Sequence, residues 1–484
     1  MGLLIIDEAQ QRSLSTLLLL KLLNHPTLNC FKVLVLSDSA PVALETATIL
    51  KSDNVLQIPP SPLPVRLTCL NTNVSDTQQC LLAARAVSTL FAENNDPCTV
   101  LILVADETSA HQMSGVLSKQ CGPSISLLQV LPALTNATSS LMLDTDFHTR
   151  KTILVTTGVP HRRLLPANVV AVVDCGTAVR QQFDFIGNCP AVITTSTTPD
   201  EEFLRTYSIT TEEVTGQCFR LYAPSSDRWC EPTIAGPIYD HVLVLRSLGV
   251  SRFTEYGLPA PAVAHALGYL RSTESIDANC QVTEFGRKVT ALGLTTVEGT
   301  TILKAIDEEV AHEMCAVLAM SQALDEKSLP LFTKRTTMTQ FKAFEGDPLT
   351  WLNVFAAYHS KSKLSDFGRK WAADHDLEFN ILLRAERIYE KLCELIDCQT
   401  SKNPFAMHRS EAEDRSRKVI KCLKTGYMCH ETSFQDGIAR LRDSGMEVYI
   451  DKQSVLFENP PERMIYMTIV LISGRLYIRG VCKI

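Results

Sequence analysis

The chain has 484 residues, of which 45% are hydrophobic and 20% are charged, and its formal net charge is −7. This length exceeds what one hydrophobic core supports, so the sequence predicts three or more domains. The acidic balance excludes a protein that attracts nucleic acid through its overall charge, and any such site has to be a local basic face.

The sixteen cysteines and the short apolar runs are not those of a secreted or membrane protein. No CxxC pair occurs, which argues against a zinc module, and the cysteines are typical of reduced structural thiols in an intracellular protein. The apolar runs at 3–6 and 17–20 are each stopped by charged residues, far short of the ~20 apolar residues of a membrane span. We therefore expect an intracellular protein without a membrane partner.

The first 180 residues contain short apolar runs that alternate with helical patterns. Each run is continuously apolar, which is typical of strands buried on both faces and predicts parallel sheets covered by helices. The runs lie at residues 3–6, 32–37, 99–104, 151–155 and 168–174. The segment 58–65 contains four prolines, which exclude a helix or a central strand, and it is predicted to link two α/β units.

The pattern changes after about residue 235. Helical periodicity dominates residues 238–250, 301–324 and 377–396. Beyond Asp436 short strand-like runs return between turn signals, which predicts a small β-barrel. The predicted order is two α/β units, a helical region and a C-terminal β region.

A pair of carboxylates follows the first apolar run, in the string LLIIDEAQQRS at 3–13. At the carboxyl end of a parallel strand, Asp7 could hold Mg²⁺ and Glu8 could polarise a water for attack on a γ-phosphate. A capped turn before a helix explains an isolated Asp-Glu pair equally well. The whole string is more specific, because it resembles motif II of the DEAH-box RNA helicases, DEAHERS, with Gln10 in the place of the histidine, as in the DEAQ-box branch.

Further strings resemble the same family in the same order along the chain. In FKVLVLSDSA (31–40), Ser37 and Ser39 correspond to motif III, and the proline-rich segment resembles the linker between the family's two RecA-like domains. The other strings are TVLILVADE (99–107), VVDCG (172–176), GQCFRLY (216–222), VLRSLGV (244–250), VTEFGRKVTALGL (282–294), FEGDPLTWLNVFAAY (344–358) and GIARLRDSG (437–445). The resemblance implies an α/β fold of RecA-like parallel sheets, followed by a winged-helix, a ratchet-like helical bundle and a C-terminal OB-fold.

The resemblance also implies domain boundaries, ligands and partners. The expected domains are a partial first RecA-like domain at 1–70, a second RecA-like domain at 71–225, a winged-helix at 226–280, a ratchet-like helical domain at 281–398 and an OB-fold at 399–484. The family's ligands are RNA and ATP with Mg²⁺, and Asp7 and Glu8 would hold the Mg²⁺ if nucleotide binds. A glycine-patch protein or an RNA-processing complex as partner, and a nuclear location, are implied in the same way.

Three departures from the family concern the nucleotide site. The sequence contains no GxxxxGK[ST] loop, whose backbone amides and lysine cradle phosphates. Motif V is rewritten as VTTGVPHRR (155–163), in which Thr156 is retained. The two arginine positions of motif VI fall on Ile209 and Glu212, where an arginine would contribute about 10³–10⁵ to the rate of phosphoryl transfer. We therefore predict a degenerate helicase homologue that acts as an RNA-binding or scaffolding module.

Two alternatives remain open from the sequence. The retained Asp7 and Glu8 also fit an active ATP-dependent RNA helicase whose phosphate-binding loop lies upstream of a truncated gene model. A pseudogene-like product without function is the other alternative.

The C-terminal region supplies the candidates for RNA contact. Residues 401–484 contain 14 Lys and Arg against 10 Asp and Glu, although the whole chain is acidic. The candidate cations are Lys418, Lys421, Lys424, Arg440 and Arg442. They could line an electrostatic groove for single strands, but a solvated helix face explains the run equally well. Tyr449 and Tyr477 could stack on bases, whereas aromatic side chains at strand positions are more typical of a core.

Overall fold

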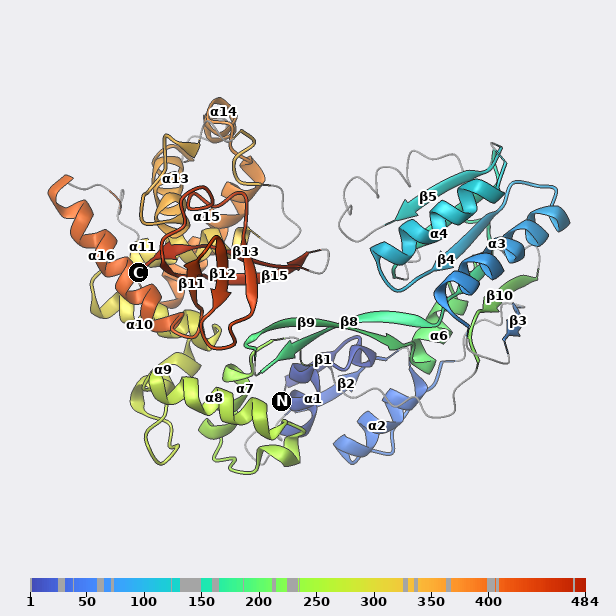
Figure 1. Cartoon of the computed structure of the whole chain (residues 1–484). Coiled ribbons are helices and arrows are strands. Elements are labelled where there is room, and N and C mark those ends of the chain that lie inside the picture. The colour runs from blue at the N-terminus through green and yellow to red at the C-terminus, as the bar shows by residue number, and fades with distance from the viewer. Residues whose placement is uncertain are drawn as a thin grey trace. The chain divides into compact units, whose positions relative to one another are not determined.

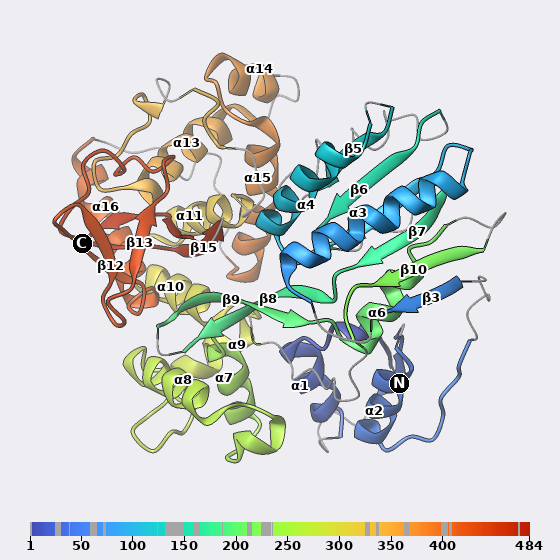
Figure 2. The same cartoon turned by 45° about the vertical axis from the view of Figure 1, so that its right-hand side comes forward.

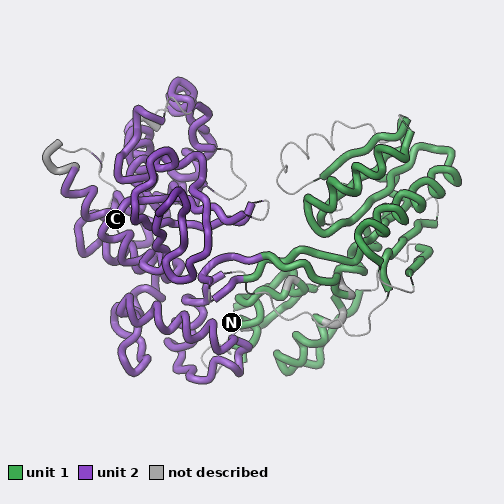
Figure 3. The backbone as a smooth tube through the Cα atoms, in the orientation of Figure 1, with its two compact units in different colours: residues 1–182, 192–234 green, residues 183–191, 235–484 purple. Residues whose placement is uncertain are grey.

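The computed structural model describes residues 2–24, 31–37, 39–58, 65–70, 74–122, 124–130, 149–158, 165–185, 187–210, 215–223, 234, 236–324, 330–334, 338–362, 367–397, 405, 409–472 and 475–484. The chain forms two compact units, residues 1–182 with 192–234 and residues 183–191 with 235–484 (Figure 3). Each unit has its own hydrophobic core. The finer division into five domains remains a prediction.

A six-stranded parallel sheet forms the centre of the first unit (Figure 1). Its strand order is β3-β10-β7-β4-β6-β5, and every neighbouring pair is parallel. The strands are β3 Val65–Cys69, β4 Thr99–Leu103, β5 Ser126–Val130, β6 Thr152–Thr156, β7 Val169–Asp174 and β10 Gly216–Arg220. Every residue of the central strands β4, β6 and β7 is buried, which confirms the prediction of a parallel sheet from continuous apolar runs.

The two faces of this sheet bury alternate side chains. Helices α3 (Asp76–Glu93) and α4 (Glu107–Gln120) lie side by side across one face, where Val100 and Ile102 point (Figure 2). Leu101 belongs to the core of the other face, next to the residues that follow α6 (Pro199–Thr206). This alternation is what a strand covered on both sides requires.

The N-terminal segment forms a smaller parallel sheet. Strands β1 (Gly2–Ile6) and β2 (Phe31–Val35) pair in parallel, and the intervening and following helices are η1 (Ala9–Gln11), α1 (Leu14–Leu22) and α2 (Ala40–Leu50). Both strands predicted in this segment are present. Residues 59–64 of the predicted proline-rich linker lie outside the described residues.

Helices make up the first part of the second unit. They are α7 Tyr239–Ser247, η4 Phe253–Tyr256, α8 Ala260–Ser272, α9 Glu284–Ala291, α10 Thr296–Asp307, α11 Ala311–Ala323, α13 Asp347–Ser362, α14 Phe367–Asp374, α15 Phe379–Leu395 and α16 Arg409–Gly426. Helix α11 forms the centre, because all its residues from Glu313 to Met320 are buried and α13 and α15 pack on it.

The predicted helix at 301–324 is two helices in the structure. Helices α10 and α11 are separated at Glu309, which has a left-handed backbone conformation (φ 61°). The backbone N–H of Val310 then bonds back to the carbonyl of Ala305 (2.8 Å) and closes the end of α10. The apolar pattern continues through this break, which is why the sequence did not reveal it.

A seven-stranded mixed sheet ends the second unit. Its order is β15-β16-β13-β12-β11-β14-β17, and β13 with β16 is its parallel pair. The strands are β11 Glu431–Gln435, β12 Ile438–Leu441, β13 Glu447–Ile450, β14 Arg463–Ile465, β15 Thr468–Ile472, β16 Arg475–Arg479 and β17 Cys482–Lys483. The β8–β9 pair (Thr177–Asp184 and Cys189–Ser196) forms a separate two-stranded sheet.

The described cysteines are all free thiols. Within the described part of the chain, no helix has the length and apolar character needed to cross a membrane.

Asp347, the first residue of α13, ties this helix to the β-sheet region. Its carboxylate accepts hydrogen bonds from the backbone N–H groups of Val455 (2.8 Å) and Val481 (2.9 Å) and from the hydroxyl of Ser454 (3.0 Å). The side chain is buried. Burial raises the pKa of Asp347 to about 6, although the three hydrogen bonds oppose the shift.

We expect Asp347→Asn to remove a pH dependence of stability. An unfolded aspartate has a pKa of about 3.9, so between about pH 4 and pH 6 the folded chain holds this proton more tightly than the unfolded chain does. The contribution of Asp347 to the free energy of unfolding therefore falls as the pH rises through this window. Urea unfolding gives the free energy of unfolding of both proteins at each pH. The value for the wild type minus the value for the variant should decrease as the pH rises through this window. A difference that does not change with pH would contradict this assignment.

Candidate functional site

Asp7 and Glu8 lie at the carboxyl end of β1, in the turn into η1. Both residues are exposed, and Asp7 Oδ1 accepts a hydrogen bond from the backbone N–H of Glu8 (2.8 Å). Glu8 has a left-handed backbone conformation (φ 55°), which costs free energy in a non-glycine residue. Gln10 follows in η1 and is half-buried. Arg12 holds the turn against α2 through a bidentate ion pair with Glu45 (2.7 and 3.1 Å).

Ser37 and Ser39 follow β2 and lie at the same sheet edge as Asp7 and Glu8, because β1 and β2 are parallel. The Ser37 hydroxyl accepts a hydrogen bond from the backbone N–H of Ser39 (3.1 Å). The buried Ser39 hydroxyl accepts from the backbone N–H of Val42 (3.2 Å) and caps α2. The structure thus brings the motif II and motif III residues together, with both serine hydroxyls bonded to local backbone.

Thr156 ends β6 and is buried at the carboxyl edge of the six-stranded sheet. Its hydroxyl donates to the carbonyl of Gly158 (3.0 Å) and accepts from the N–H of the same residue (3.4 Å). This hydroxyl shapes the turn after β6. The rest of the rewritten motif V, from residue 159 to 163, lies outside the described residues.

Ile209 occupies a core position. Its side chain is 1% exposed and belongs to the apolar cluster on one face of the six-stranded sheet, together with Leu101 and Val172. It also fills the space beside Gly216, where an added Cβ would lie 2.6 Å from Ile209 Cγ2. Glu212, the other position expected to carry a motif VI arginine, lies outside the described residues.

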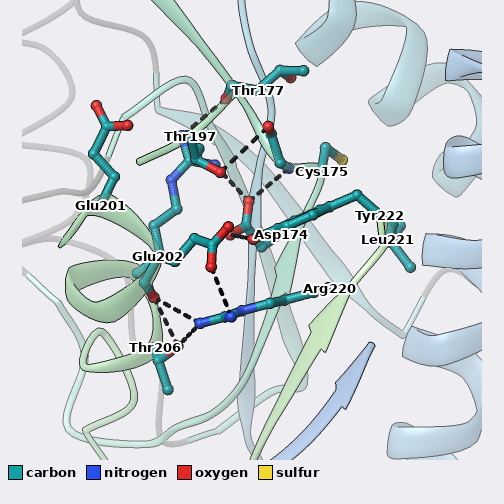
Figure 4. A network of polar contacts seen from close by, with 12 residues as sticks. Asp174, Cys175, Thr177, Thr197, Glu201, Glu202, Thr206, Arg220, Leu221 and Tyr222 are labelled. Atoms are coloured by element: carbon teal, nitrogen blue, oxygen red, sulfur yellow. Dashed lines mark hydrogen bonds and ion pairs between the residues drawn. The ribbon is translucent and has the colours of Figure 1, made fainter. Parts of the chain in front are cut away.

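A buried polar cluster surrounds Asp174 at the carboxyl end of β7 (Figure 4). Asp174 Oδ1 forms an ion pair with Nη1 of Arg205 (2.5 Å) and also accepts a hydrogen bond from the backbone N–H of Gly176 (2.8 Å). The other oxygen, Oδ2, accepts a hydrogen bond from the hydroxyl of Tyr222 (3.0 Å). Burial, followed by the charge of Asp174, raises the pKa of Tyr222, so its hydroxyl stays protonated and can donate. Both oxygens of the buried carboxylate are therefore satisfied from within the protein.

Gly176 allows the close packing of this cluster. It has a positive φ of 75°, and an added Cβ would lie 2.2 Å from the Tyr222 ring. A side chain at this position would therefore displace the ring that carries the donor to Asp174.

A second ion pair lies beside the first (Figure 4). Arg220 Nη1 contacts Glu202 Oε2 at 2.8 Å, and the Thr206 hydroxyl donates to the carbonyl of Glu202 (2.8 Å). Glu202 and Arg205 both come from α6, so two ion pairs hold this helix on the sheet. Sequence reasoning did not single out Arg205. One feature of the sequence could have identified it: Arg205 is a cation four positions before Ile209, within the segment that aligns with motif VI.

Four of the five predicted RNA-contact cations form ion pairs within the second unit. The pairs are Lys418–Asp414 (3.5 Å), Lys421–Glu308 (2.5 Å), Arg440–Glu447 (3.1 Å) and Arg442–Glu431. Lys424 has no ion-pair partner among the described residues. Exposed pairs contribute only about 0–1 kcal/mol, so phosphates can compete for the exposed cations. Their carboxylates nevertheless neutralise most of the predicted basic face.

The Arg442 pair is more tightly held than the others. Glu431 is 12% exposed and also pairs with Arg463. Burial alone would raise the pKa of Glu431, but the guanidiniums of Arg463 and Arg442 outweigh burial and lower it. The ion pair between Arg442 and Glu431 is therefore stronger than a pair between two exposed side chains.

Tyr449 and Tyr477 lie side by side on β13 and β16. They are direct partners in the parallel register, and their ring centroids are 5.6 Å apart. Tyr449 is 43% exposed and Tyr477 is half-buried. Tyr449 is therefore not the core residue that its strand position suggested.

Among the described residues, no group of three or more His, Cys, Asp or Glu side chains could hold a metal ion. Asp7 and Glu8 provide two exposed carboxylates. Mg²⁺ is commonly shared between one or two carboxylates and the phosphates of a nucleotide. The edge beside β1 therefore fits Mg²⁺ only together with a nucleotide.

Comparison with curated proteins finds RNA helicases. The chain is 24% identical over 348 residues to the probable ATP-dependent RNA helicase DHX35 of Homo sapiens, covering 69% of this chain and 48% of that protein. It is 24% identical over 477 residues to the probable DHX35 homolog of Caenorhabditis elegans, covering 92% and 62%. It is 22% identical over 497 residues to the pre-mRNA-splicing factor ATP-dependent RNA helicase prp22 of Schizosaccharomyces pombe, covering 97% and 41%.

The chain spans about half the length of the curated relatives it matches. No protein-family model matches it.

We expect Arg205→Ala to lower the free energy of unfolding of the first unit by about 3–5 kcal/mol, because Asp174 would remain buried without its counter-charge. Urea unfolding of the full chain measures this change. The matched control is Arg180→Ala, since Arg180 pairs with Glu201 (2.8 Å) in a more exposed setting, where about 0–1 kcal/mol is expected. Equal effects of the two substitutions would show that Asp174 does not depend on Arg205.

Proposed function

Because the chain belongs to the DEAH-box RNA helicase family, we propose that it acts in RNA processing as an RNA-binding or scaffolding protein that does not hydrolyse ATP. The observation that carries this proposal is the burial of Ile209. The resemblance assigns to this position an arginine that neutralises charge on the γ-phosphate. A buried isoleucine packed on the sheet cannot reach a phosphate or supply that charge.

The neighbouring arginine does not substitute for the missing one. Arg205 is 4% exposed and is held by Asp174. Releasing it would leave a buried carboxylate without its counter-charge, which is unfavourable. An arginine at this point of a phosphoryl-transfer site contributes about 10³–10⁵ to the rate, so its loss alone abolishes useful turnover.

The retained carboxylates at the β1 edge support nucleotide binding without turnover. Asp7 and Glu8 remain exposed there, next to Ser37 and Ser39. ATP with Mg²⁺ would supply a phosphate chain that this edge can hold through the metal. The same carboxylates favour the alternative, an active ATP-dependent RNA helicase.

The finer architecture also belongs to this proposal. We assign α7 and α8 to a winged-helix (226–280), α9 to α15 to a ratchet-like bundle (281–398), and α16 with β11 to β17 to an OB-fold (399–484). The support is the helical first part and the mixed sheet of the second unit. A glycine-patch partner and a nuclear location rest on family resemblance alone.

We expect the full chain to bind fluorescent oligo(U) and to release no phosphate from ATP in the presence of RNA. Anisotropy titration measures the first and a coupled phosphate assay measures the second, with a parallel titration of fluorescent ADP. Glu8→Gln is the control for contaminating enzyme, because a contaminant keeps its activity in this preparation. Phosphate release that depends on RNA and disappears in Glu8→Gln would overturn the proposal in favour of the active helicase.

We expect Ile209→Arg to destabilise the first unit and to leave ATP hydrolysis absent. A charge placed among Leu101, Val172 and Cys218 has no counter-charge in that cluster. The matched control Ile209→Val removes one methylene group, for which about 0.5–1.5 kcal/mol is expected. Thermal unfolding and the phosphate assay report on both variants. A soluble, stable Ile209→Arg protein with new RNA-stimulated hydrolysis would show that this position faces a nucleotide.

A further inference from the structure

Two cysteines meet where α11 packs on α15. Cys315 lies in the first half of α11 and Cys393 lies in the last turn of α15, and both side chains are buried in the core of the second unit. Both are thiols in this structure, and the Cys315 thiol forms a hydrogen bond with the sulfur of Cys393. The two sulfur atoms are therefore already in contact across the interface between the helices.

His312 and Tyr389 also surround the sulfur of Cys393. His312 Nδ1 lies 3.8 Å from this sulfur and 2.9 Å from the hydroxyl of Tyr389. The hydrogen bond from Cys315 lowers the pKa of Cys393, although burial opposes this shift. Hydrogen bonds with His312 and Tyr389 lower the pKa further. Cys393 is therefore held near its thiolate form, which is the nucleophilic form of the side chain.

Other buried cysteines of the chain have a different environment. Cys80 and Cys175 belong to the core of the first unit, and burial raises the pKa of both thiols. Burial also raises the pKa of Cys422, which lies in the same core cluster as Cys393. Since a buried thiol with a raised pKa is unreactive, the neighbours of Cys393, and not its burial, distinguish it.

We propose that Cys393 and Cys315 form a reversible disulfide when the protein meets a hydroperoxide, which joins α11 to α15. In the first step, Cys393 gives its proton to His312 and its sulfur attacks the peroxide. The O–O bond breaks, a sulfenic acid forms on Cys393, and the leaving oxygen takes up the proton from His312. In the second step, the sulfur of Cys315 attacks the sulfenic sulfur, the S–O bond breaks, and hydroxide leaves as water with the proton of Cys315. The two thiols together lose two electrons, and the hydroperoxide is reduced by them.

The position of Cys393 gives a small oxidant access to it. Terminal turns of helices open at a low free energy, and the neighbouring residues Glu394 and Leu395 are exposed. Thiol reductants return the disulfide to the dithiol by exchange. This inference goes beyond the proposed function, because it depends on neither RNA nor nucleotide.

Peptide mapping of the full chain under non-reducing conditions tests the inference. After treatment with dilute hydrogen peroxide and alkylation in denaturant, we expect a crosslinked pair of peptides that contains Cys315 and Cys393 and that dithiothreitol separates. Cys80 and Cys175 are the matched control in the same sample, and both should be recovered alkylated. The midpoint of urea unfolding should be higher for the oxidised protein than for the reduced protein.

Substitutions test the order of the two steps. Cys315→Ala should stop the reaction at a sulfenic acid on Cys393, which dimedone traps, whereas Cys393→Ala should leave Cys315 reduced. His312→Gln should slow the crosslink by about tenfold, because the thiolate fraction of Cys393 falls. The map of the wild type decides the inference if a variant does not fold.

Two results would overturn the inference. One is the recovery of both Cys315 and Cys393 in alkylated form from a sample in which the half-buried Cys280 is already oxidised. The other is a crosslink between them that is no more abundant than crosslinks of Cys80 or Cys175, because the oxidation would then not be selective.

Discussion

The structure of the first unit depends on the need to satisfy one buried carboxylate. Asp174 lies at the end of a central strand with no exposed surface, so its charge has to be matched from within the protein. Arg205 from α6 and Tyr222 beyond β10 provide that match. With α6 held in this way, the residue one turn further on, Ile209, packs on the sheet as a core side chain. The ion pair that holds α6 and the burial of Ile209 are thus parts of one packed arrangement.

In the proposed function, binding a nucleotide and hydrolysing it would depend on different groups. Asp7 and Glu8 keep two carboxylates at a strand end, and such an edge can bind a metal-bound phosphate chain whether or not the bond breaks. Hydrolysis needs additional positive charge that acts on the transition state. Arg205, the nearest arginine, is held in a structural ion pair with Asp174, so under the proposed function nucleotide binding would not be coupled to hydrolysis.

Sequence patterns predicted the parallel sheet well and the site only in part. Continuous apolar runs identified β4, β6 and β7, because a strand that is buried on both faces needs an apolar side chain at nearly every position. The Arg205–Asp174 pair joins residues 31 positions apart, and no local pattern encodes such a contact. The break at Glu309 was hidden because a single left-handed residue does not interrupt the apolar repeat. Which face of β13 is exposed depends on the elements that pack against the sheet. The exposure of Tyr449 could therefore not be predicted from the sequence of its strand alone.

The distribution of charge in the second unit limits what a run of basic residues predicts. A run of lysines and arginines predicts phosphate binding only if the cations are available, and here the fold places a carboxylate beside most of them. Competing with a weak surface pair costs the RNA part of its electrostatic gain. The basic residues of the second unit are therefore available to a polyanion only to the extent that it displaces these carboxylates.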